Sequence, residues 1–257
     1  MLPLKSFAVD LARKSGVLLK ETFTKTHKIQ YKGEINIVTE ADKMSEDLII
    51  AAINRKFPDH GILSEESPAI TGAGKLRWII DPLDGTTNYA HGYPVFCVSI
   101  ALENEGEIVL GVVYDPMREE MFIAERGEGA YLNDKKLKVS SVSNISRSLL
   151  ATGFPYDIRD SKENNLDYFN SMAVNVQAIR RAGAAALDLA YLAAGRFDGF
   201  WELKLKPWDT AAGCLLVTEA GGAISDIAGK KWHLQSPNLL ASNGLIHEQM
   251  IKVLSLK

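Results

Sequence analysis

The sequence has few cysteines, no long apolar run and almost no net charge, and each absence excludes a class of protein. Cys97 and Cys214 are its only two cysteines, too few for a disulfide framework or a zinc site built on cysteine pairs. No window holds about 18 uninterrupted apolar residues, so we predict no transmembrane helix. Charged residues interrupt the apolar N-terminal residues, which argues against a signal peptide. We therefore expect a cytoplasmic protein without a membrane partner.

The charge balance excludes a broad attraction to polyanions. Lys and Arg total 29 and Asp and Glu total 32, so the formal net charge is -3, and we do not expect direct nucleic-acid binding. Apolar residues make up 46% and charged residues 24% of the 257 positions. This composition is typical of a globular protein with one large domain or two small ones.

The apolar pattern predicts helices and strands along the whole chain. In the first half, a helix near residues 4–18 and another at 39–56 precede short strands that form an antiparallel meander. In the second half, helices alternate with strands, as in an α/β layer. The polar stretch 140–148 suggests a boundary between an N-terminal α+β lobe, 1–145, and a C-terminal α/β lobe, 146–257, within one compact body. The further predicted helices span 166–173, 184–194 and 209–220, with a last one from about 247, and the predicted strands include 95–102, 108–114, 121–124, 149–151, 200–201 and 239–241.

The segment DPLDGTTN at residues 81–88 is the most informative one for chemistry. An apolar strand delivers Asp81 to its end, Pro82 is expected to force a turn, and Asp84 can then face the same point. Residues 86–88 can open a helix, whose free N–H groups bind phosphate. Two carboxylates would repel a phosphate unless a hard cation such as Mg²⁺ lies between them. The alternative is a structural turn in which Asp84 caps the helix.

Other acidic residues support the metal interpretation, although each has a structural alternative. Glu65 and Glu66 follow an apolar strand but could form a solvated loop. Asp209 opens a helix, where the helix dipole alone favours an acid. Asp42 lies three residues after Thr39, the spacing of a capping box. The sequence has no GxSxG turn and no histidine pair at metal-ligand spacing, so no side-chain nucleophile competes with a metal-activated water.

Five segments in order resemble the inositol monophosphatase family over nearly the whole chain. DPLDGTTNY at 81–89 is similar to the DP(I/L)DGTTNF signature, and WDTAAG at 208–213 with EAGG at 219–222 is similar to the second signature. The segments NIVTEAD at 36–42 and SEES at 64–67 match two further family segments. RRAGAAALDL at 180–189 resembles the bacterial and archaeal branch.

The resemblance implies a role for each matching position. Glu65 and Thr86 would orient the attacking water, and Asp42 would support Thr86. The backbone amides of Gly85 and Thr86 would hold phosphate. Glu202 would hydrogen-bond a substrate hydroxyl, beside an alcohol pocket lined by small residues. The implied magnesium ligands are the carboxylates of Glu65, Asp81, Asp84 and Asp209 and the carbonyl of Leu83, and the implied pocket residues are Gly183, Ala184 and Ala185.

The resemblance also implies a fold, a reaction and an assembly. Family members fold as an αβαβα five-layered sandwich of the α+β class, shared with fructose-1,6-bisphosphatase. We expect hydrolysis of inositol monophosphate or a similar sugar or polyol phosphate with two or three Mg²⁺ per site, sensitivity to lithium, and a homodimer. The alternatives are a fructose-1,6-bisphosphatase, a nucleotide-bisphosphate phosphatase, or a regulatory protein that acts through a transcription or RNA partner.

Overall fold

The computed structural model describes residues 2–23, 29–31 and 37–255. Residue 36, the first of the segment NIVTEAD, lies outside the described residues. The helices follow the apolar periodicity, and the predicted helix at 166–173 is found at those bounds. They are α1 (Leu2–Thr22), α2 (Glu40–Lys56), α3 (Thr86–Ala90), α4 (Leu166–Ala173), α5 (Ala185–Ala193), α6 (Pro207–Glu219) and α7 (His247–Leu254), with the 3₁₀ turn η1 (Ile145–Arg147).

The strands form two large sheets and one two-stranded hairpin. The seven-stranded sheet has the order β3-β4-β5-β6-β7-β8-β9, and the five-stranded sheet has the order β11-β10-β12-β14-β13. The strands are β1 (Ile29–Tyr31), β2 (Ile37–Thr39), β3 (Gly61–Ser64), β4 (Leu76–Asp84), β5 (Cys97–Asn104), β6 (Glu107–Asp115), β7 (Glu120–Glu125), β8 (Gly129–Leu132), β9 (Lys135–Lys136), β10 (Leu149–Thr152), β11 (Ala178–Arg180), β12 (Gly199–Leu203), β13 (Ala223–Ser225) and β14 (Asn238–Ser242).

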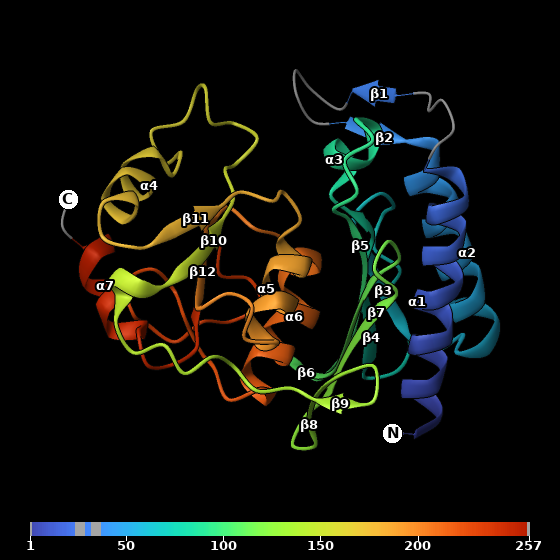
Figure 1. Cartoon of the computed structure of the whole chain (residues 1–257). Coiled ribbons are helices and arrows are strands. Elements are labelled where there is room, and N and C mark those ends of the chain that lie inside the picture. The colour runs from blue at the N-terminus through green and yellow to red at the C-terminus, as the bar shows by residue number, and fades with distance from the viewer. Residues whose placement is uncertain (1, 24–28, 32–36, 256–257) are drawn as a thin grey trace.

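Helices and sheets stack in five layers, so the predicted αβαβα sandwich is confirmed (Figure 1). Helices α1 and α2 cover one face of the seven-stranded sheet, and α5 and α6 fill the space between the two sheets. Helices α4 and α7 cover the outer face of the five-stranded sheet. Three buried apolar clusters hold these layers together. The boundary at 145/146 stays a prediction.

The seven-stranded sheet contains the predicted antiparallel meander, but Pro82 acts differently from the expectation. The strands β4 to β9 pair antiparallel in chain order, and β3 adds to β4 in parallel. Strand β4 continues through Pro82 to Asp84, with a register shift between Asp81 and Asp84. The expected turn at Pro82 is therefore wrong. A proline lacks the N–H that a ladder needs, and a bulge accommodates this loss without ending the strand.

Much of the second signature segment holds the layers together. Gly213 of α6 faces Leu189 of α5 so closely that a Cβ on residue 213 would lie 2.6 Å from the Cβ of Leu189. At the end of α6, the Glu219 carboxylate accepts hydrogen bonds from the amides of Gly127 at 2.8 Å and Gly129 at 2.9 Å. These contacts tie α6 to the β7–β8 hairpin and fix the direction in which the start of α6 points.

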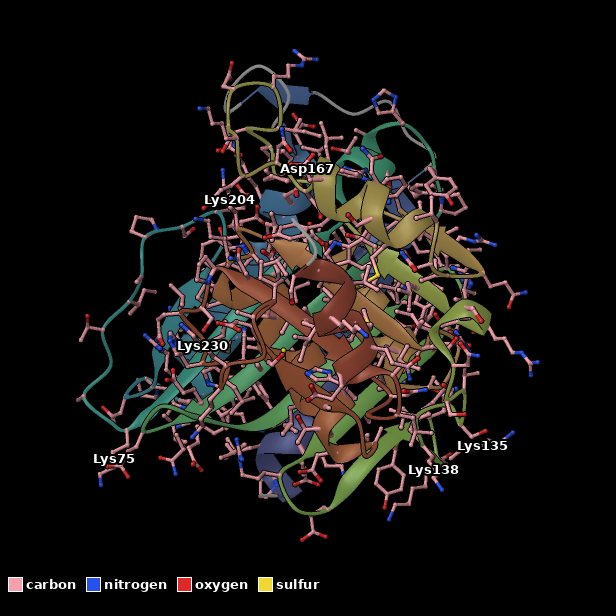
Figure 2. The ribbon with its side chains drawn as sticks, turned by 90° about the vertical axis from the view of Figure 1, so that its left-hand side faces the viewer. Lys75, Lys135, Lys138, Asp167, Lys204 and Lys230 are labelled. Atoms are coloured by element: carbon pink, nitrogen blue, oxygen red, sulfur yellow. The ribbon has the colours of Figure 1, made fainter. Side chains whose placement is uncertain are left out.

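The lysines labelled on the face drawn in Figure 2 do not form a single group. Among the described residues, no helix is long and apolar enough to cross a bilayer. Lys75 is labelled at the lower left, Lys135 and Lys138 close together at the lower right, and Lys204 and Lys230 over the body of the molecule (Figure 2). Lys75 also pairs with Glu105 at 2.7 Å.

A buried histidine links β13, β14 and α7 through two serines. The Nε2 of His247 lies 2.9 Å from the Ser225 hydroxyl, and its Nδ1 lies 2.9 Å from the Ser242 hydroxyl. Ser225 donates its proton to the carbonyl of Asp226, and Ser242 accepts from the amide of Gly244. Ser225 must therefore accept from Nε2–H, and Ser242 can donate to Nδ1, so the network fits a neutral imidazole.

This network predicts a loss of stability in acid. Burial lowers the pKa of His247 below its ordinary 6.5, against the opposing effect of Glu248. As the pH falls below 6.5, the unfolded chain binds a proton that the native chain resists, so the free energy of unfolding decreases. We expect urea unfolding at pH 7.5 and 5.5 to show a larger loss for the wild type than for His247→Gln. Equal losses in the two proteins would contradict the assignment.

Candidate active site

A cavity of about 550 Å³ opens where the two sheets approach the N-terminal ends of α5 and α6. Its walls come from segments that are far apart in the chain, namely the end of β4, the loop after β10, the start of α5 and the segment between β12 and α6. Of the residues expected from the sequence to form a site, all but Asp42 line it. Those are Glu65, Asp81, Leu83, Asp84, Gly85, Thr86, Gly183, Ala184, Ala185, Glu202 and Asp209.

The bulge in β4 turns Asp81 and Asp84 toward this cavity. Both carboxylates are buried, with Asp81 2% and Asp84 9% exposed. Burial raises the pKa of Asp81 well above 3.8, and the charges of Glu65, Asp84 and Asp209 raise it further. Four carboxylates are therefore close enough to disfavour one another's ionisation, and a cation between them would relieve that repulsion.

Asp84 joins the first signature segment to the second half of the chain. Its Oδ2 accepts a hydrogen bond from the amide of Ala186, in the first turn of α5, at 2.7 Å. Burial raises the pKa of Asp84 to about 6, although the amides at the start of α5 favour its charged form. The predicted capping role of Asp84 is thus present, but on α5 rather than on α3. The thiol of Cys97 donates to the same oxygen at 3.6 Å, and its pKa is raised by burial, which makes it a poor nucleophile.

Glu65 and Asp209 reach the cavity from two other elements. Glu65 follows β3 directly, and β3 runs parallel to β4, so the ends of the two strands lie side by side. Asp209 lies in the first turn of α6, where its Oδ2 accepts from the amide of Lys206 at 2.7 Å. One oxygen of Asp209 therefore caps the helix. Burial raises the pKa of Asp209, and the charges of Asp84 and Glu65 add to this.

Asp42 serves as a helix cap and as a partner of Thr86. In the capping box, its Oδ2 accepts from the amide and the hydroxyl of Thr39 at 2.7 and 2.6 Å. Its Oδ1 accepts from the hydroxyl of Thr86 at 2.9 Å. The two interpretations of Asp42 are therefore compatible. Because this bond uses the hydroxyl proton, Thr86 can accept a hydrogen bond from a water in the cavity.

The donor set suits a hard divalent cation. Carboxylates and a carbonyl are the ligands that Mg²⁺ and Ca²⁺ prefer, and the carbonyl of Leu83 lies at the same wall, 3.1 Å from the Thr86 hydroxyl. Within the described ranges, however, no three His, Cys, Asp or Glu side chains already stand at metal-ligand spacing. The acids thus converge on one cavity without forming a finished cage.

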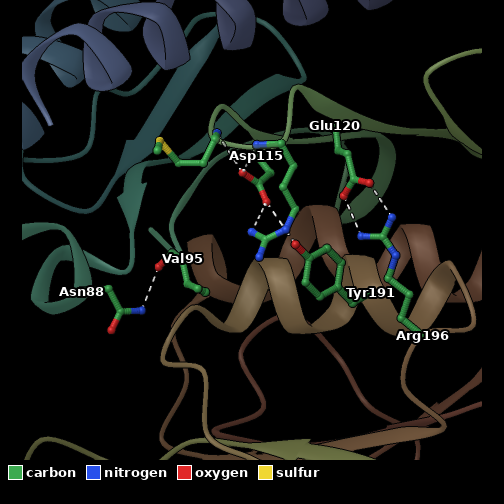
Figure 3. A network of polar contacts seen from close by, with 8 residues as sticks. Asn88, Val95, Asp115, Glu120, Tyr191 and Arg196 are labelled. Carbon is green, nitrogen blue, oxygen red and sulfur yellow. Dashed lines mark hydrogen bonds and ion pairs between the residues drawn. The ribbon is translucent and has the colours of Figure 1, made fainter. Parts of the chain in front are cut away.

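Helix α5 is anchored at its far end by a polar network (Figure 3). The Tyr191 hydroxyl donates to Asp115 at 3.0 Å, and Arg118 donates to the same carboxylate oxygen at 3.0 Å. Arg196 binds Glu120 through both of its terminal nitrogens. These contacts fix α5 against β6 and β7, so the start of the helix keeps its position at the cavity.

Asn88 binds the residue that directly precedes the pocket residues Gly183–Ala185. Its side-chain amide donates to the carbonyl of Val95 at 2.7 Å and to that of Ala182 at 2.8 Å (the first of these bonds is drawn in Figure 3). Because Ala182 directly precedes Gly183, this bond joins α3 of the first signature segment to the pocket wall. Nothing in the sequence indicated that Asn88 contacts the second half of the chain.

Several residues that line the cavity were missed by the sequence analysis. Gly153 is one of them, and a Cβ on it would lie 2.1 Å from the Oε1 of Glu202. Only a residue without a side chain leaves room for the carboxylate there. The position after the predicted strand 149–151 was the available signal. The other missed residues include Phe154, Tyr156, Arg181, Asp188 and Lys204.

We expect Gly153→Ala to displace the Glu202 carboxylate and to lower kcat/KM for a polyol phosphate by about tenfold to hundredfold, since misplacement of about 1 Å can cost that much. Steady-state kinetics measures the effect. Gly106→Ala is the control for a purely structural effect, because its φ of 90° strains an alanine while no atom lies within 4 Å of a Cβ there. We expect it to lower stability and to keep the wild-type kcat/KM. If Gly153→Ala kept the wild-type kcat/KM, the close approach of Gly153 to Glu202 would not matter for catalysis.

The comparisons with known proteins give the chain its family. The model of the inositol monophosphatase family matches residues 1–256. The chain belongs to the inositol monophosphatase family. A solved structure described as extragenic suppressor protein suhB from Bartonella henselae superimposes with a TM-score of 0.95 at 40% identity, covering 99% of each chain. The similarity to this solved structure thus also confirms the expected fold class.

Members of the family that resemble this chain carry two kinds of name. An inositol-1-monophosphatase from Mesorhizobium japonicum is 43% identical over 247 residues, which is 95% of this chain and 93% of that protein. A Nus factor SuhB from Pseudomonas aeruginosa is 45% identical over 252 residues, which is 95% of this chain and 92% of that protein. The comparisons therefore establish the family and leave its two described roles open.

Proposed function

We propose that the chain is a magnesium-dependent phosphatase that releases phosphate from inositol monophosphate or a similar polyol phosphate. One observation carries the proposal: four carboxylates from β4, α6 and the end of β3 line one cavity together with Thr86, whose hydroxyl is held by Asp42. Membership of the family and the relative named inositol-1-monophosphatase support it. We assign the metal positions to Glu65, Asp81, Leu83, Asp84 and Asp209, with two or three Mg²⁺ per site.

Bound magnesium would neutralise phosphoryl charge and lower the pKa of a water, which is the chemistry that phosphate-ester hydrolysis requires. The chain's own groups supply orientation. Thr86 accepts a hydrogen bond from the attacking water, and Glu65 orients the same water. The amides of Gly85 and Thr86 donate to phosphate oxygens.

The alcohol part of the substrate lies beyond the phosphate. Glu202 accepts a hydrogen bond from a substrate hydroxyl there, and burial and the charge of Asp84 raise the pKa of Glu202 to about 8. Gly183, Ala184 and Ala185 provide a wall without hydrogen-bonding side chains, which leaves room for more than one polyol.

A phosphate-release screen with purified protein tests this function. We expect kcat/KM to be highest for a polyol monophosphate and turnover to vanish after chelation and return with Mg²⁺. Fructose 1,6-bisphosphate and a nucleotide bisphosphate belong in the same screen, because a clear preference for either would replace inositol monophosphate as the substrate. Absence of turnover on every ester with Mg²⁺ present would refute the proposal. Sedimentation analysis in parallel tests the proposed homodimer.

A second function is favoured by the relatives named Nus factor SuhB. Under this alternative, the chain acts through a partner protein in transcription rather than by hydrolysis. The variant Asp84→Asn separates the two functions. Rescue of a deletion phenotype by Asp84→Asn would favour the partner role, and failure to rescue by a folded variant would favour hydrolysis.

A further inference from the structure

Asp188 is an acidic residue of the cavity wall to which the sequence analysis assigned no role. It lies in α5 one turn after Ala184, whose carbonyl accepts from the Asp188 amide at 2.9 Å. Residues spaced by four share one helix face, and helical side chains lean toward the N-terminus. The carboxylate of Asp188 therefore leans toward the start of α5, and it lines the same cavity as Ala184 and Ala185.

The carboxylate of Asp188 borders the cavity without a hydrogen-bond partner among the described residues. Asp188 is 2% exposed, and among the described residues its side chain makes no hydrogen bond and no ion pair within 4 Å. Asp198, at 6% exposure, differs: its carboxylate accepts from the hydroxyl of Ser140 at 2.5 Å and from the amide of Leu149 at 2.7 Å. Its oxygens border the cavity rather than the closed interior, where only the hydroxyl of Ser64 and the indole N–H of Trp232 lack a partner among the described residues. A molecule in the cavity can therefore hydrogen-bond to Asp188.

The neighbours of Asp188 define the chemistry of that ligand. The charges of Glu202 and Asp84 raise its pKa beyond the effect of burial, and the charge of Arg181 opposes them. The Glu202 side chain likewise makes no hydrogen bond within the part of the chain that the structure describes. Two hydrogen-bond acceptors with one guanidinium nearby thus face the same space. Such a pair suits a neutral molecule that carries two hydroxyl groups.

We propose that Asp188 binds a second hydroxyl of the substrate, so that Asp188 and Glu202 together select phosphate esters of polyols with neighbouring hydroxyls. This inference rests on the proposed function and specifies its substrate class. It assigns specificity to α5, whose small residues at 184 and 185 leave the space that the polyol needs. Asp188 contributes to binding of the alcohol part and takes no part in the attack on phosphorus.

The test compares two esters that differ in their hydroxyls. One is an inositol monophosphate, and the other is p-nitrophenyl phosphate, whose alcohol part carries no further hydroxyl. We expect Asp188→Leu, which keeps the branching at Cγ and removes both acceptor oxygens, to lower kcat/KM for the inositol ester at least tenfold more than for the aryl ester, chiefly through KM. Asp188→Asn, which keeps one acceptor oxygen, should show a smaller loss of selectivity and covers the case in which the leucine variant does not fold.

The outcomes separate this inference from the function on which it rests. Asp198→Asn is the control for the loss of a buried acid outside the cavity, and we expect it to keep the wild-type ratio of the two kcat/KM values. If the wild type hydrolyses both esters and both Asp188 variants keep this ratio within threefold, the inference is wrong and the proposed function stands. If the wild type hydrolyses neither ester, the proposed function fails and the inference fails with it.

Discussion

Asp209→Asn is expected to lower kcat by about 10³-fold, equivalent to roughly 4 kcal/mol of transition-state stabilisation. The asparagine keeps an oxygen that can accept from the Lys206 amide, so the start of α6 retains its cap. What is lost is one negative charge among the four carboxylates that converge on the cavity. Phosphate release at saturating Mg²⁺ measures the effect, and circular dichroism with thermal unfolding checks the fold.

A matched control for Asp209→Asn is Asp226→Asn. The Asp226 carboxylate also caps backbone amides, those of Ala228 and Lys230 at 2.9 and 2.8 Å, but it does not line the cavity. We expect Asp226→Asn to keep wild-type turnover. Turnover near the wild-type value for Asp209→Asn would show that its charge does not serve catalysis and would remove it from the metal site.

Thr86→Ala is expected to lower kcat by about 10²- to 10³-fold, because it removes the acceptor that orients the attacking water. Thr86→Ser keeps the hydroxyl and its bond to Asp42, so it should restore most of the activity. Single-turnover measurements with the same ester compare the two variants. This serine rescue distinguishes a chemical role of the hydroxyl from a role of the methyl group in packing.

The control for Thr86 is Thr218→Ala. Its hydroxyl donates to the carbonyl of Cys214 within α6 at 2.9 Å, outside the cavity. We expect this variant to keep wild-type turnover with a small change in stability. If Thr86→Ala were as active as Thr218→Ala, the water-orienting role of Thr86 would be disproved.

The layers of the fold could be predicted because their signal is strong and local. The 3.6-residue periodicity of the helices and the apolar strands of the meander mark their positions within a few residues. Strands β11 and β13 were not predicted, since each has only three residues and little pattern of its own. Strand β11 forms through its pairing with β10, and β13 forms through its pairing with β14. Both pairings are tertiary contacts that the local sequence does not show.

The site was only partly predictable, for reasons that particular residues show. Asp81 and Asp84 stand in one short segment with an unusual pattern, so their convergence could be inferred. The second signature segment mixes roles, because Asp209 lines the cavity whereas Glu219 ties α6 to a hairpin. Asp188 resembles an ordinary acid in the first turn of a helix, and Gly153 resembles a loop glycine. Their surroundings arise only when β12 and α5 come together.

The central claim is that Glu65, Asp81, Asp84 and Asp209 bind divalent cations in one cavity. Anomalous diffraction from crystals soaked in Mn²⁺ tests it most directly, because Mn²⁺ takes the same oxygen ligands as Mg²⁺. We predict at least one anomalous peak within coordination distance, about 2.1–2.3 Å, of carboxylate oxygens from these four residues, and its loss in Asp81→Asn. Absence of a peak in this cavity, or peaks only elsewhere on the protein, would contradict the account.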